Sequence, residues 1–277
     1  MSLGAVSSPR ITVVGSINLD LVARCERLPR VGETITGATF ARVPGGKGAN
    51  QAVACARLGA DVTLIGAVGG DSFAEDAVAQ LRESKVALDL ETSAEPTGVA
   101  LIYVDASGET QIVVAPGANW TLDDVEPPAH DAVLCQLEIP DAAVTSAWEA
   151  CTGFFCLNAA PARPVGVDPD LTIVNRYEQE TLTRRDGLVA VTLGAEGALL
   201  LDDGDEIARA EPPPVEVVDG TAAGDAFTAC LLVSLLEGRE AGEALERACA
   251  AGALAASRFG AQPSLPTAAD VDEVLGD

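Results

Sequence analysis

A carboxylate stands at the head of a long apolar segment. The stretch VDGTAAGDAFTACLLVSLLEG, residues 218–238, places Asp225 after small residues and before a run that is apolar on almost every side. A helix with that pattern is buried inside a protein. An acidic residue at a helix start can cap free N–H groups and is favoured by the helix dipole. The residues alone leave open whether Asp225 is a cap or a functional carboxylate.

The segment PGGKGANQA, residues 44–52, indicates a binding site for a polar ligand. Its glycines let backbone N–H groups approach a ligand closely at the entry to a helix, and Lys47 and Asn50 add directional donors. The lysine lies inside the glycines, so the segment is not a Walker P-loop. An ordinary glycine-rich turn is the alternative. Lys47 is one of only two lysines in the chain, which favours the ligand site.

Polar side chains also follow the predicted strands. In GSINLD, Asn18 and Asp20 are two positions apart in an extended segment, so both can face one ligand, although an Asx turn is the alternative. The polar or glycine positions at the ends of later strands are Glu138, Asn175, Glu178, Thr192 and Gly194. Open α/β sheets bind ligands at the carboxyl edge of their strands. The convergence of these residues on one edge indicates a site there.

Apolar runs of strand length alternate with helical patterns along the chain. Strands are predicted at 10–16 and 61–69, and helices at 48–59 and 71–84, the second capped by Asp71 or Ser72. Further strand-like apolar segments are 131–138, 153–160, 171–175 and 188–194. Strands without alternation are buried on both faces of a parallel sheet. The predicted fold class is therefore α/β with a mainly parallel sheet.

Two regions, 22–46 and 98–117, break this rhythm with an alternation of period two. The second holds the turn Asp-Ala-Ser-Gly between two apolar arms, which predicts a hairpin. The two regions are expected to form a small antiparallel sheet that covers a ligand, a partner subunit or both. Between 171–175 and 188–194 only residues 176–187 remain, so a crossover helix there must be very short or absent.

Composition narrows the classes of function. The formal net charge of −25 over 277 residues argues against a nucleic-acid partner. Without an apolar run of membrane-spanning length or a leader sequence, we expect a cytoplasmic protein. The histidine, His130, is expected at the surface rather than in a metal site. The cysteines contain no C-x-x-C pair and are expected to be reduced core residues: 25, 55, 135, 151, 156, 230 and 249.

These motifs together resemble the ribokinases, within the PfkB-type carbohydrate kinases. GSINLD, PGGKGANQA, TGVALIYVD, QLE, NRYE, VTLGAEG, VDGTAAGD and RFGAQPS occur in the order and approximate spacing of that family over residues 10–267. The resemblance implies a single Rossmann-like domain over residues 1–277, with a mainly parallel sheet flanked by helices. It also implies a small antiparallel β lid, formed by 22–46 and 98–117, which covers the sugar and often forms a homodimer contact.

The implied activity is ATP-dependent phosphorylation of D-ribose at O5, which gives ribose 5-phosphate and ADP. Deoxyribose or another pentose or carbohydrate is the alternative substrate. A non-catalytic sugar-sensing protein is the alternative class, and the presence of Asp225 and Gly224 argues against it. ATP, Mg²⁺ and K⁺ are the implied cofactors, with no nucleic acid or membrane as partner.

The resemblance also assigns roles to residues. Asp225 becomes the general base, and the backbone N–H groups of Ala222, Ala223 and Gly224 form an anion hole for the transferred phosphoryl group. Sugar-binding positions are Asn18, Asp20, Gly45, Gly46, Lys47, Asn50, Ala100, Glu138 and Asp225. Nucleotide positions are Asn175, Glu178, Thr192, Leu193, Gly194, Ala195, Glu196, Gly197, Gly224 and Cys249, of which the first two organise phosphates and hydrated Mg²⁺. Potassium positions are Asp219, Thr221, Ala255, Arg258, Gly260 and Ser264.

Two departures from the family pattern concern the nucleotide. Cys249 stands where many ribokinases carry an asparagine beside the adenine, and a thiol forms only weak hydrogen bonds. Looser nucleoside selectivity is the expectation. The short segment 176–187 removes scaffold beside the nucleotide but leaves every catalytic position intact.

Overall fold

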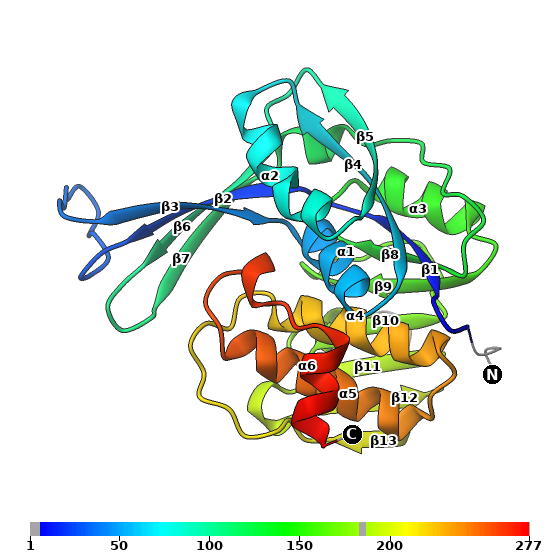
Figure 1. Ribbon diagram of the computed structural model, residues 1–277. Helices are drawn as coiled ribbons and strands as arrows, with labels where there is room; N and C mark the ends of the chain where they lie inside the picture. Colours follow the sequence, from blue (N-terminus) through cyan, green and yellow to red (C-terminus); the bar gives the residue numbers. More distant parts are fainter. Residues whose placement is uncertain (1–5, 183–186, 277) are drawn as a thin grey trace.

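The computed structural model describes residues 6–182 and 187–276 as an α/β structure with two sheets (Figure 1). The strands of the larger sheet are β1 (Arg10–Val14), β4 (Asp61–Gly69), β5 (Ala87–Ser93), β8 (Ala132–Gln136), β9 (Phe154–Asn158), β10 (Leu171–Asn175), β11 (Leu188–Thr192), β12 (Ala198–Asp202) and β13 (Asp205–Ala210). Those of the smaller sheet are β2 (Asn18–Arg24), β3 (Thr39–Gly45), β6 (Gly98–Val104) and β7 (Thr110–Ala115).

The larger sheet runs in the order β13-β12-β11-β10-β9-β8-β1-β4-β5. Every neighbouring pair from β11 to β5 is parallel, whereas β12 and β13 extend one edge as antiparallel strands. The central strands are mostly apolar, and in β8 every residue is buried. The predicted fold class, with its mainly parallel sheet, is confirmed. The carboxyl ends of the parallel strands meet at one edge.

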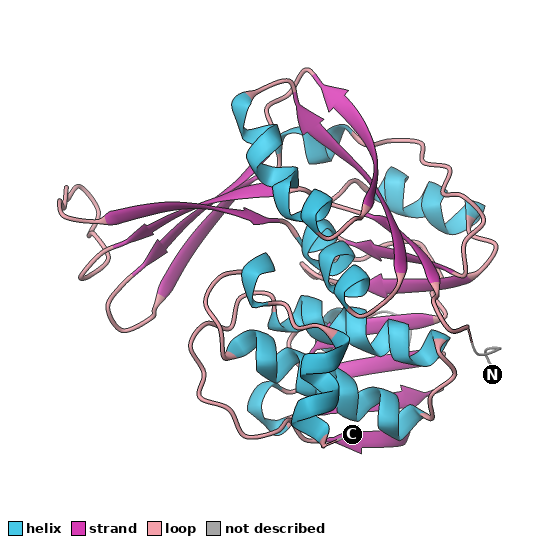
Figure 2. Cartoon of the chain, viewed as in Figure 1, coloured by secondary structure: helices cyan, strands magenta, loops and turns pink. Residues whose placement is uncertain are grey.

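Helices cover both faces of this sheet (Figure 2). The α-helices are α1 (Lys47–Arg57), α2 (Ser72–Glu83), α3 (Asp141–Ala150), α4 (Ala223–Leu236), α5 (Ala241–Ala256) and α6 (Ala268–Leu275). The 3-10 helices are η1 (Gly117–Thr121), η2 (Glu178–Thr181), η3 (Gly194–Glu196) and η4 (Gln262–Ser264). The core on one face is built with α1, α2, α4, α5 and α6, and the core on the other with α3 and η1.

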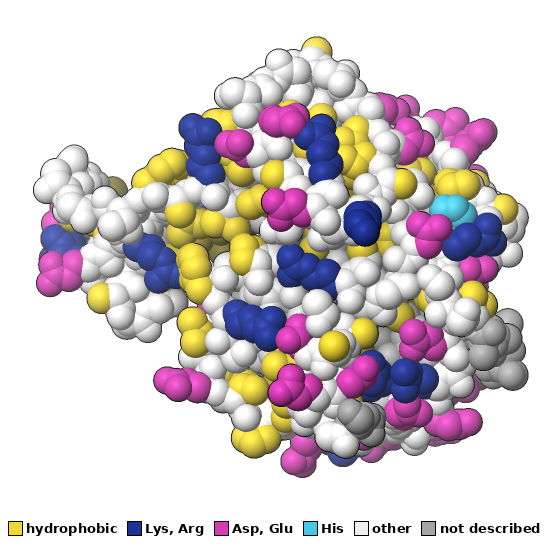
Figure 3. All heavy atoms as spheres, viewed as in Figure 1, with side chains coloured by type: hydrophobic (Ala, Val, Ile, Leu, Met, Phe, Trp, Pro, Cys, Tyr) yellow, Lys and Arg dark blue, Asp and Glu magenta, His cyan; other side chains and the backbone are white. Residues whose placement is uncertain are grey.

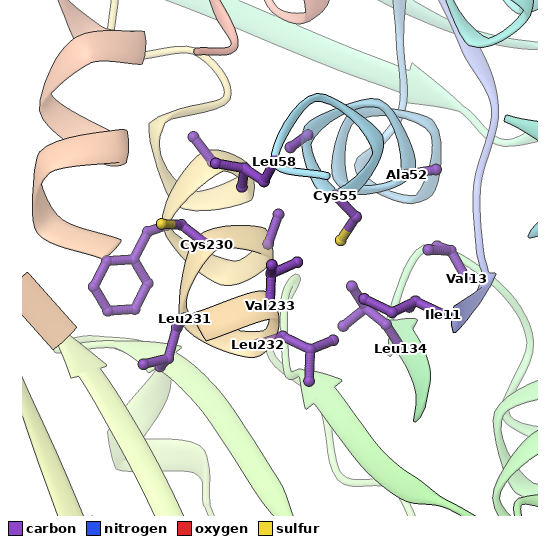
Figure 4. Close-up of a cluster of buried hydrophobic side chains, with 14 of the residues drawn as sticks. Ile11, Val13, Ala52, Cys55, Leu58, Leu134, Cys230, Leu231, Leu232 and Val233 are labelled. Carbon is purple, nitrogen blue, oxygen red and sulfur yellow. The ribbon is translucent and has the colours of Figure 1, made fainter. Parts of the chain in front are cut away.

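Helix α4 is buried over most of its length. All its residues from Asp225 to Leu236 are buried, because α1 and α5 pack against it and the sheet lies beneath it. Figure 4 shows its side chains meeting those of α1, β1 and β8 in one apolar cluster. The prediction of a helix apolar on all sides is confirmed. Its packing fixes the position of its N-terminal turn relative to α1.

The smaller sheet projects from the side of the body in the order β3-β2-β6-β7 (Figure 1). The pairs β2–β3 and β6–β7 are antiparallel, and β2 and β6 in the middle pair in parallel. The hairpin predicted at Asp-Ala-Ser-Gly is confirmed, since the N–H of Gly108 donates to the carbonyl of Asp105 at 3.1 Å. Strand β2 begins at Asn18, upstream of the predicted boundary at residue 22.

The boundaries of the other predicted helices and strands agree only in part with the structure. Helix α2 begins after Asp71, whose side chain accepts from the backbone N–H groups of Phe73 and Ala74 as predicted. The first strand ends at Val14, two residues short of the prediction. After β10 the chain forms the short 3-10 helix η2, as expected, and residues 183–186 lie outside the described part.

The expectations for His130 and for the cysteines can be compared with their positions in the structure. His130 is partly buried, with its Nδ1 2.8 Å from the hydroxyl of Thr12. The cysteines are free thiols, and most of them are buried. Within the described ranges, no helix is long and apolar enough to cross a membrane.

Candidate active site

Strand β2 directs Asn18 and Asp20 to the same buried face, as their spacing predicts. Their exposed fractions are 3% and 7%. Asn18 Oδ1 accepts from Asn119 Nδ2 at 2.8 Å. Asp20 is opposite Ala100 in the register with β6, and its carboxylate lies against Gly45, where an added Cβ would overlap both oxygens. The small residue at position 45 therefore makes room for the carboxylate.

The glycine-rich segment closes tightly on the end of β1. Gly46 has a φ of 89°, and an added Cβ would lie 2.8 Å from the backbone nitrogen of Asn18, so glycine is required by both conformation and space. Glu138 Oε2 accepts from the hydroxyl of Ser16 at 2.6 Å and from the backbone N–H of Lys47 at 3.0 Å. One carboxylate thus ties the turn after β1 to the start of α1.

Asp225 lies across this segment at the start of α4, with 5% of its surface exposed. Its Oδ2 accepts from Asn50 Nδ2 at 2.9 Å and its Oδ1 from Gln51 Nε2 at 2.8 Å. The N-cap is Ala222, without a side-chain cap bond, so Asp225 does not cap its own helix. Burial raises the pKa of Asp225 above its ordinary value, although the charge of Lys47 and these hydrogen bonds oppose the shift.

Acidic groups surround Lys47. Burial, together with the charges of Glu138 and Asp225, raises the pKa of Asp20 to about 7. Burial acts to lower the pKa of Lys47, but the carboxylates of Asp225, Glu138 and Glu178 outweigh it and raise that pKa above its ordinary value. Lys47 therefore stays charged. The pocket between β2, α1 and α4 is a strongly polar enclosure with acceptors on several sides and one cation.

The N-terminus of α4 opens toward a second space. Ala222 adopts the left-handed conformation, with φ 60°, and the N–H of Ala223 donates to the carbonyl of Gly220 at 3.3 Å. Within the described residues, the N–H groups of Ala222 and Gly224 have no protein acceptor. An atom added at Gly224 would meet nothing within 4 Å. Free donors and the positive end of a helix dipole there favour an anion.

A cavity of about 530 Å³ continues from this turn toward α5. It brings together many of the predicted nucleotide positions, namely Thr192, Gly194, Ala195, Gly197, Gly224 and Cys249. It is also lined by Pro212, Pro213, Pro214, Val215, Val217 and Phe227, which the sequence did not single out. The cavity is mostly apolar, as a slot for a planar ring requires.

Not all predicted nucleotide positions line this cavity. Leu193 and Glu196 are outside its lining, and Glu196 instead forms an ion pair with Arg176 at 2.6 Å. The thiol of Cys249 donates to the carbonyl of Ala210 at 3.7 Å. Burial, with the nearby Cys230 and Glu246, raises the pKa of Cys249 to about 12, so the thiol is neutral.

A reciprocal turn follows β10. Asn175 Oδ1 accepts from the backbone N–H groups of Tyr177 and Glu178, both at 2.9 Å. Glu178 Oε2 accepts in return from the N–H of Asn175 at 2.8 Å. This turn uses only one carboxylate oxygen of Glu178, and the charge of Glu178 also acts to raise the pKa of Lys47. In the part of the chain that the structure covers, no group of three or more His, Cys, Asp or Glu residues could hold a metal ion.

Asp219 joins the turn before α4 to the loop after α5. Its Oδ1 accepts from the backbone N–H of Thr221 at 3.0 Å and from the Thr221 hydroxyl at 2.6 Å, and its Oδ2 accepts from the N–H of Gly260 at 3.0 Å. These hydrogen bonds lower the pKa of Asp219 against the effect of burial. The two segments that carry the predicted potassium positions are therefore held side by side.

The other predicted potassium positions lie along the same part of the chain, with Ala255 in the last turn of α5, Arg258 and Gly260 in the loop that follows, and Ser264 in η4. The carbonyl of Ala255 accepts from the N–H of Arg258 at 3.2 Å, and the hydroxyl of Ser264 donates to the carbonyl of Ala261 at 2.7 Å. The guanidinium of Arg258 pairs with Asp270 at 3.3 Å, so only its backbone is available to this loop. Carboxylate, carbonyl and hydroxyl oxygens are the donors that a hard monovalent cation prefers.

Sequence reasoning missed a set of buried amides beside the predicted residues. These are Gln51, Asn119, Gln136 and Asn158. A signal was present, since Gln136 and Asn158 are polar residues at the ends of otherwise apolar strands. A buried amide must be hydrogen-bonded, so such a position indicates a polar partner nearby.

Comparisons with known proteins show the family of the chain. The model of the pfkB family carbohydrate kinases matches residues 8–152 and 165–268. A ribokinase of Bacillus subtilis is 36% identical over 299 residues, covering 96% of this chain and 99% of that protein. A solved ribokinase of Thermotoga maritima superposes with a TM-score of 0.87 at 29% identity, covering 97% of this chain and 100% of that one. A ribokinase of Arabidopsis thaliana solved with ribose and ATP has a TM-score of 0.85 at 30% identity, with coverage of 98% and 99%.

Proposed function

Because the chain belongs to the pfkB family of carbohydrate kinases, we propose that it transfers the γ-phosphoryl group of ATP to O5 of D-ribose. The products are ribose 5-phosphate and ADP. One observation carries the proposal: the buried carboxylate of Asp225 lies between a polar pocket and a helix N-terminus with free N–H groups. A base and an anion site on either side of one reaction centre are what phosphoryl transfer to an alcohol requires.

The polar pocket suits a sugar rich in hydroxyl groups. Asp20 and Glu138 offer carboxylate acceptors, and Lys47 offers a donor. Asn50 Oδ1 is buried and has no hydrogen-bond partner among the described residues, so a hydroxyl that donates to it would satisfy it. The remaining proposed sugar positions are Asn18, Gly45, Gly46 and Ala100. Such a site rejects analogues that lack a hydroxyl, because the missing hydroxyl would leave buried polar groups of the protein without a hydrogen-bond partner.

The cavity beyond α4 accepts the nucleotide. We place the adenine in the apolar slot near Cys249 and Pro213 and the phosphates at the N-terminus of α4. Asp225 then takes the proton from O5, while O5 forms a bond to the γ-phosphorus and the bond from phosphorus to the bridging oxygen of ADP breaks. The N–H groups of Ala222 and Gly224 stabilise the charge on the transferred group, and Ala223 joins them if it releases Gly220.

Two metal ions belong to this proposal. Asn175 and Glu178 would hold hydrated Mg²⁺ at the phosphates, where one Glu178 oxygen remains available. Mg²⁺ supplies neutralisation of the phosphate charge. Asp219, Thr221 and the carbonyls of the loop after α5 would hold K⁺, and the oxygen-only donor set fits that ion. Replacing K⁺ by Na⁺ should lower kcat, whereas equal rates in both salts would exclude the potassium site.

The smaller sheet carries the proposed dimer contact. Its apolar residues Phe40, Ile112, Val113 and Val114 are exposed, and in Figure 3 hydrophobic side chains gather where this sheet joins the body. A second copy of the chain that pairs lid to lid would cover them. We also propose a cytoplasmic location.

A coupled assay of ADP release tests the substrate. Ribose, deoxyribose, fructose and adenosine are compared at saturating ATP and Mg²⁺. We expect the highest kcat/KM with ribose. A tenfold advantage for fructose or adenosine, which corresponds to about 1.4 kcal/mol in transition-state binding, would overturn the assignment. Tight sugar binding without ADP release from any substrate would instead support the sugar-sensing alternative.

A further inference from the structure

A chain of buried amides lies behind Asp225. Gln51 Nε2 donates both to Asp225 Oδ1 at 2.8 Å and to Asn158 Oδ1 at 2.9 Å. Gln51 Oε1 accepts from Gln136 Nε2 at 2.7 Å. Gln51 and Gln136 are fully buried, and Asn158 is 8% exposed. Every polar atom of the Gln51 side chain is therefore engaged inside the protein, and none of them is left for a ligand.

The main chain fixes the direction of these hydrogen bonds. Asn158 Nδ2 donates to the carbonyl of Ile173 at 3.2 Å, and a carbonyl can only accept. Asn158 must therefore present its oxygen to Gln51, and Gln51 must present its amino group to Asn158 and Asp225. A flipped Gln51 would place its oxygen against both of these acceptors. Strands β9 and β10 thus set the orientation of a side chain on α1.

The two oxygens of Asp225 consequently have different surroundings. Oδ1 is held from the interior by Gln51. Oδ2 is held by Asn50, whose own oxygen has no partner among the described residues and which belongs to the proposed sugar site. An ionised carboxylate has further lone pairs on each oxygen, so Oδ2 can still accept a proton.

We propose that Gln51 is a positioning residue for the phosphoryl transfer, which anchors Asp225 through Oδ1 and thereby directs Oδ2 at O5 of the sugar. The inference rests on the proposed role of Asp225 as the base. A carboxylate without this anchor can rotate about its Cβ–Cγ bond, and a misplacement of about 1 Å at a reacting group can cost on the order of 10²-fold in rate. Gln136 and Asn158 act through Gln51.

The Gln51→Met variant tests the proposal, since methionine has similar length but no N–H group. We expect kcat to fall about ten- to a hundredfold, while KM for ribose and for ATP changes less than about threefold. The acidic limb of the kcat profile should move to higher pH, because a donor to the charged carboxylate is lost. The other charged groups that face Asp225, which are Lys47, Glu138 and Asp20, are unchanged. If Gln51 only filled space, its replacement by methionine would not shift the acidic limb.

A double variant shows whether Gln51 acts through the base. Gln51→Met should cause no further loss of kcat in an Asp225→Asn background. A further tenfold loss there would overturn the proposal, as would a folded Gln51→Met variant with parental kcat and pH profile. If Asp225→Asn alone remains fully active, it is the proposed function that fails, which keeps the two failures distinct.

A second variant covers the case in which Gln51→Met does not fold. Gln136→Met keeps the donor to Asp225 but releases the oxygen of Gln51, so we expect a several-fold loss of kcat and a smaller shift of the acidic limb in the same direction. Parental behaviour of a folded Gln136→Met variant would contradict the chain of amides. Gln80→Met makes the same chemical change on α2, where Gln80 contacts Glu83, and serves as the control with an unshifted profile.

Discussion

In the proposed sugar pocket, a Cβ added at Gly46 or Gly48 would lie within 2.8 Å of backbone atoms. In the proposed nucleotide region, a Cβ added at Gly194, Gly220 or Gly224 would meet nothing within 4 Å, although one added at Gly197 would overlap the carbonyl of Ala210. The pocket is bordered by buried carboxylates and amides, most of which are hydrogen-bonded, while Asn50 Oδ1 has no partner among the described residues. The nucleotide cavity is apolar and lined largely by loops and small residues. We infer from this comparison that the proposed sugar site is ordered in advance, whereas the proposed nucleotide site is open around the N-terminus of α4. Selectivity should therefore be strict for the sugar and loose for the base.

The largest expected effect lies where the two regions meet. Asp225→Asn retains the shape of the side chain and an acceptor for Gln51, and Asn50 can turn its unpartnered oxygen toward the new NH2 group, but an amide cannot accept the proton. We expect ribose and ATP to bind within about tenfold of the parent, a margin of roughly 1.4 kcal/mol. Loss of a general base should lower kcat by about 10²–10⁴-fold. Near-parental kcat in the folded variant, measured by ADP release, would remove the base from this position.

The burial of Asp20 should make the free energy of unfolding depend on pH. Its pKa is about 7 in the folded protein and returns to the ordinary 3.8 on unfolding. Between these values the folded state binds more protons, so its stability falls as pH rises. Asp20→Asn has no such proton to lose. Between pH 5 and pH 8 the free energy of unfolding of the ligand-free variant should therefore rise by about 2.6 kcal/mol relative to that of the parent.

Urea unfolding at both pH values measures this difference. If the free energies of unfolding of the two proteins differ by the same amount at both pH values, the pKa of Asp20 is not raised by burial. The same variant should bind ribose at least about tenfold more weakly, because an acceptor for a hydroxyl is lost.

A matched pair of glycines sharpens the comparison of the two regions. Alanine favours a helix over glycine by about 1 kcal/mol, yet at position 48 its Cβ would lie 2.5 Å from backbone atoms of Gly15 and Ser16. Overlap with backbone outweighs that gain, and we expect Gly48→Ala to lower the free energy of unfolding by about 2 kcal/mol. Gly220→Ala, in open space, should stay within about 0.5 kcal/mol of the parent. Equal effects in thermal and urea unfolding would contradict the contrast.

The smallest effect concerns the base of the nucleotide. With a neutral thiol at Cys249, kcat/KM with GTP should lie within about tenfold of that with ATP. Cys249→Asn adds a donor and an acceptor, and should raise the preference for ATP several-fold. Cys249→Ala removes the thiol without adding an amide, so its preference should match the parent. A parent that already prefers ATP by a thousandfold would show that other groups select the base.

The regions also differ in how far the sequence predicts them. Asn18, Asp20 and Lys47 are visible in the sequence because local spacing places them on one strand or beside glycines. Gln51 and Gln136 form their hydrogen bond only because β8 lies beneath α1, and that proximity is a property of topology. Edge strands such as β5 and β13 have alternating exposure and lack the apolar run that identifies a central strand. The proline-rich lining of the cavity belongs to a loop, where hydrophobic periodicity gives no information.

The parallel pairing of β2 with β6 has a consequence for how the enzyme assembles. Asn18 pairs with Gly98 in this register, and the strands β4 and β5 of the larger sheet lie between them in the sequence. Contacts between residues far apart in sequence form slowly, because a long loop must close first. We therefore expect the hairpin of β2 and β3 to form before β6 pairs with β2. Hydrogen exchange during refolding would show late protection of the β6 amides.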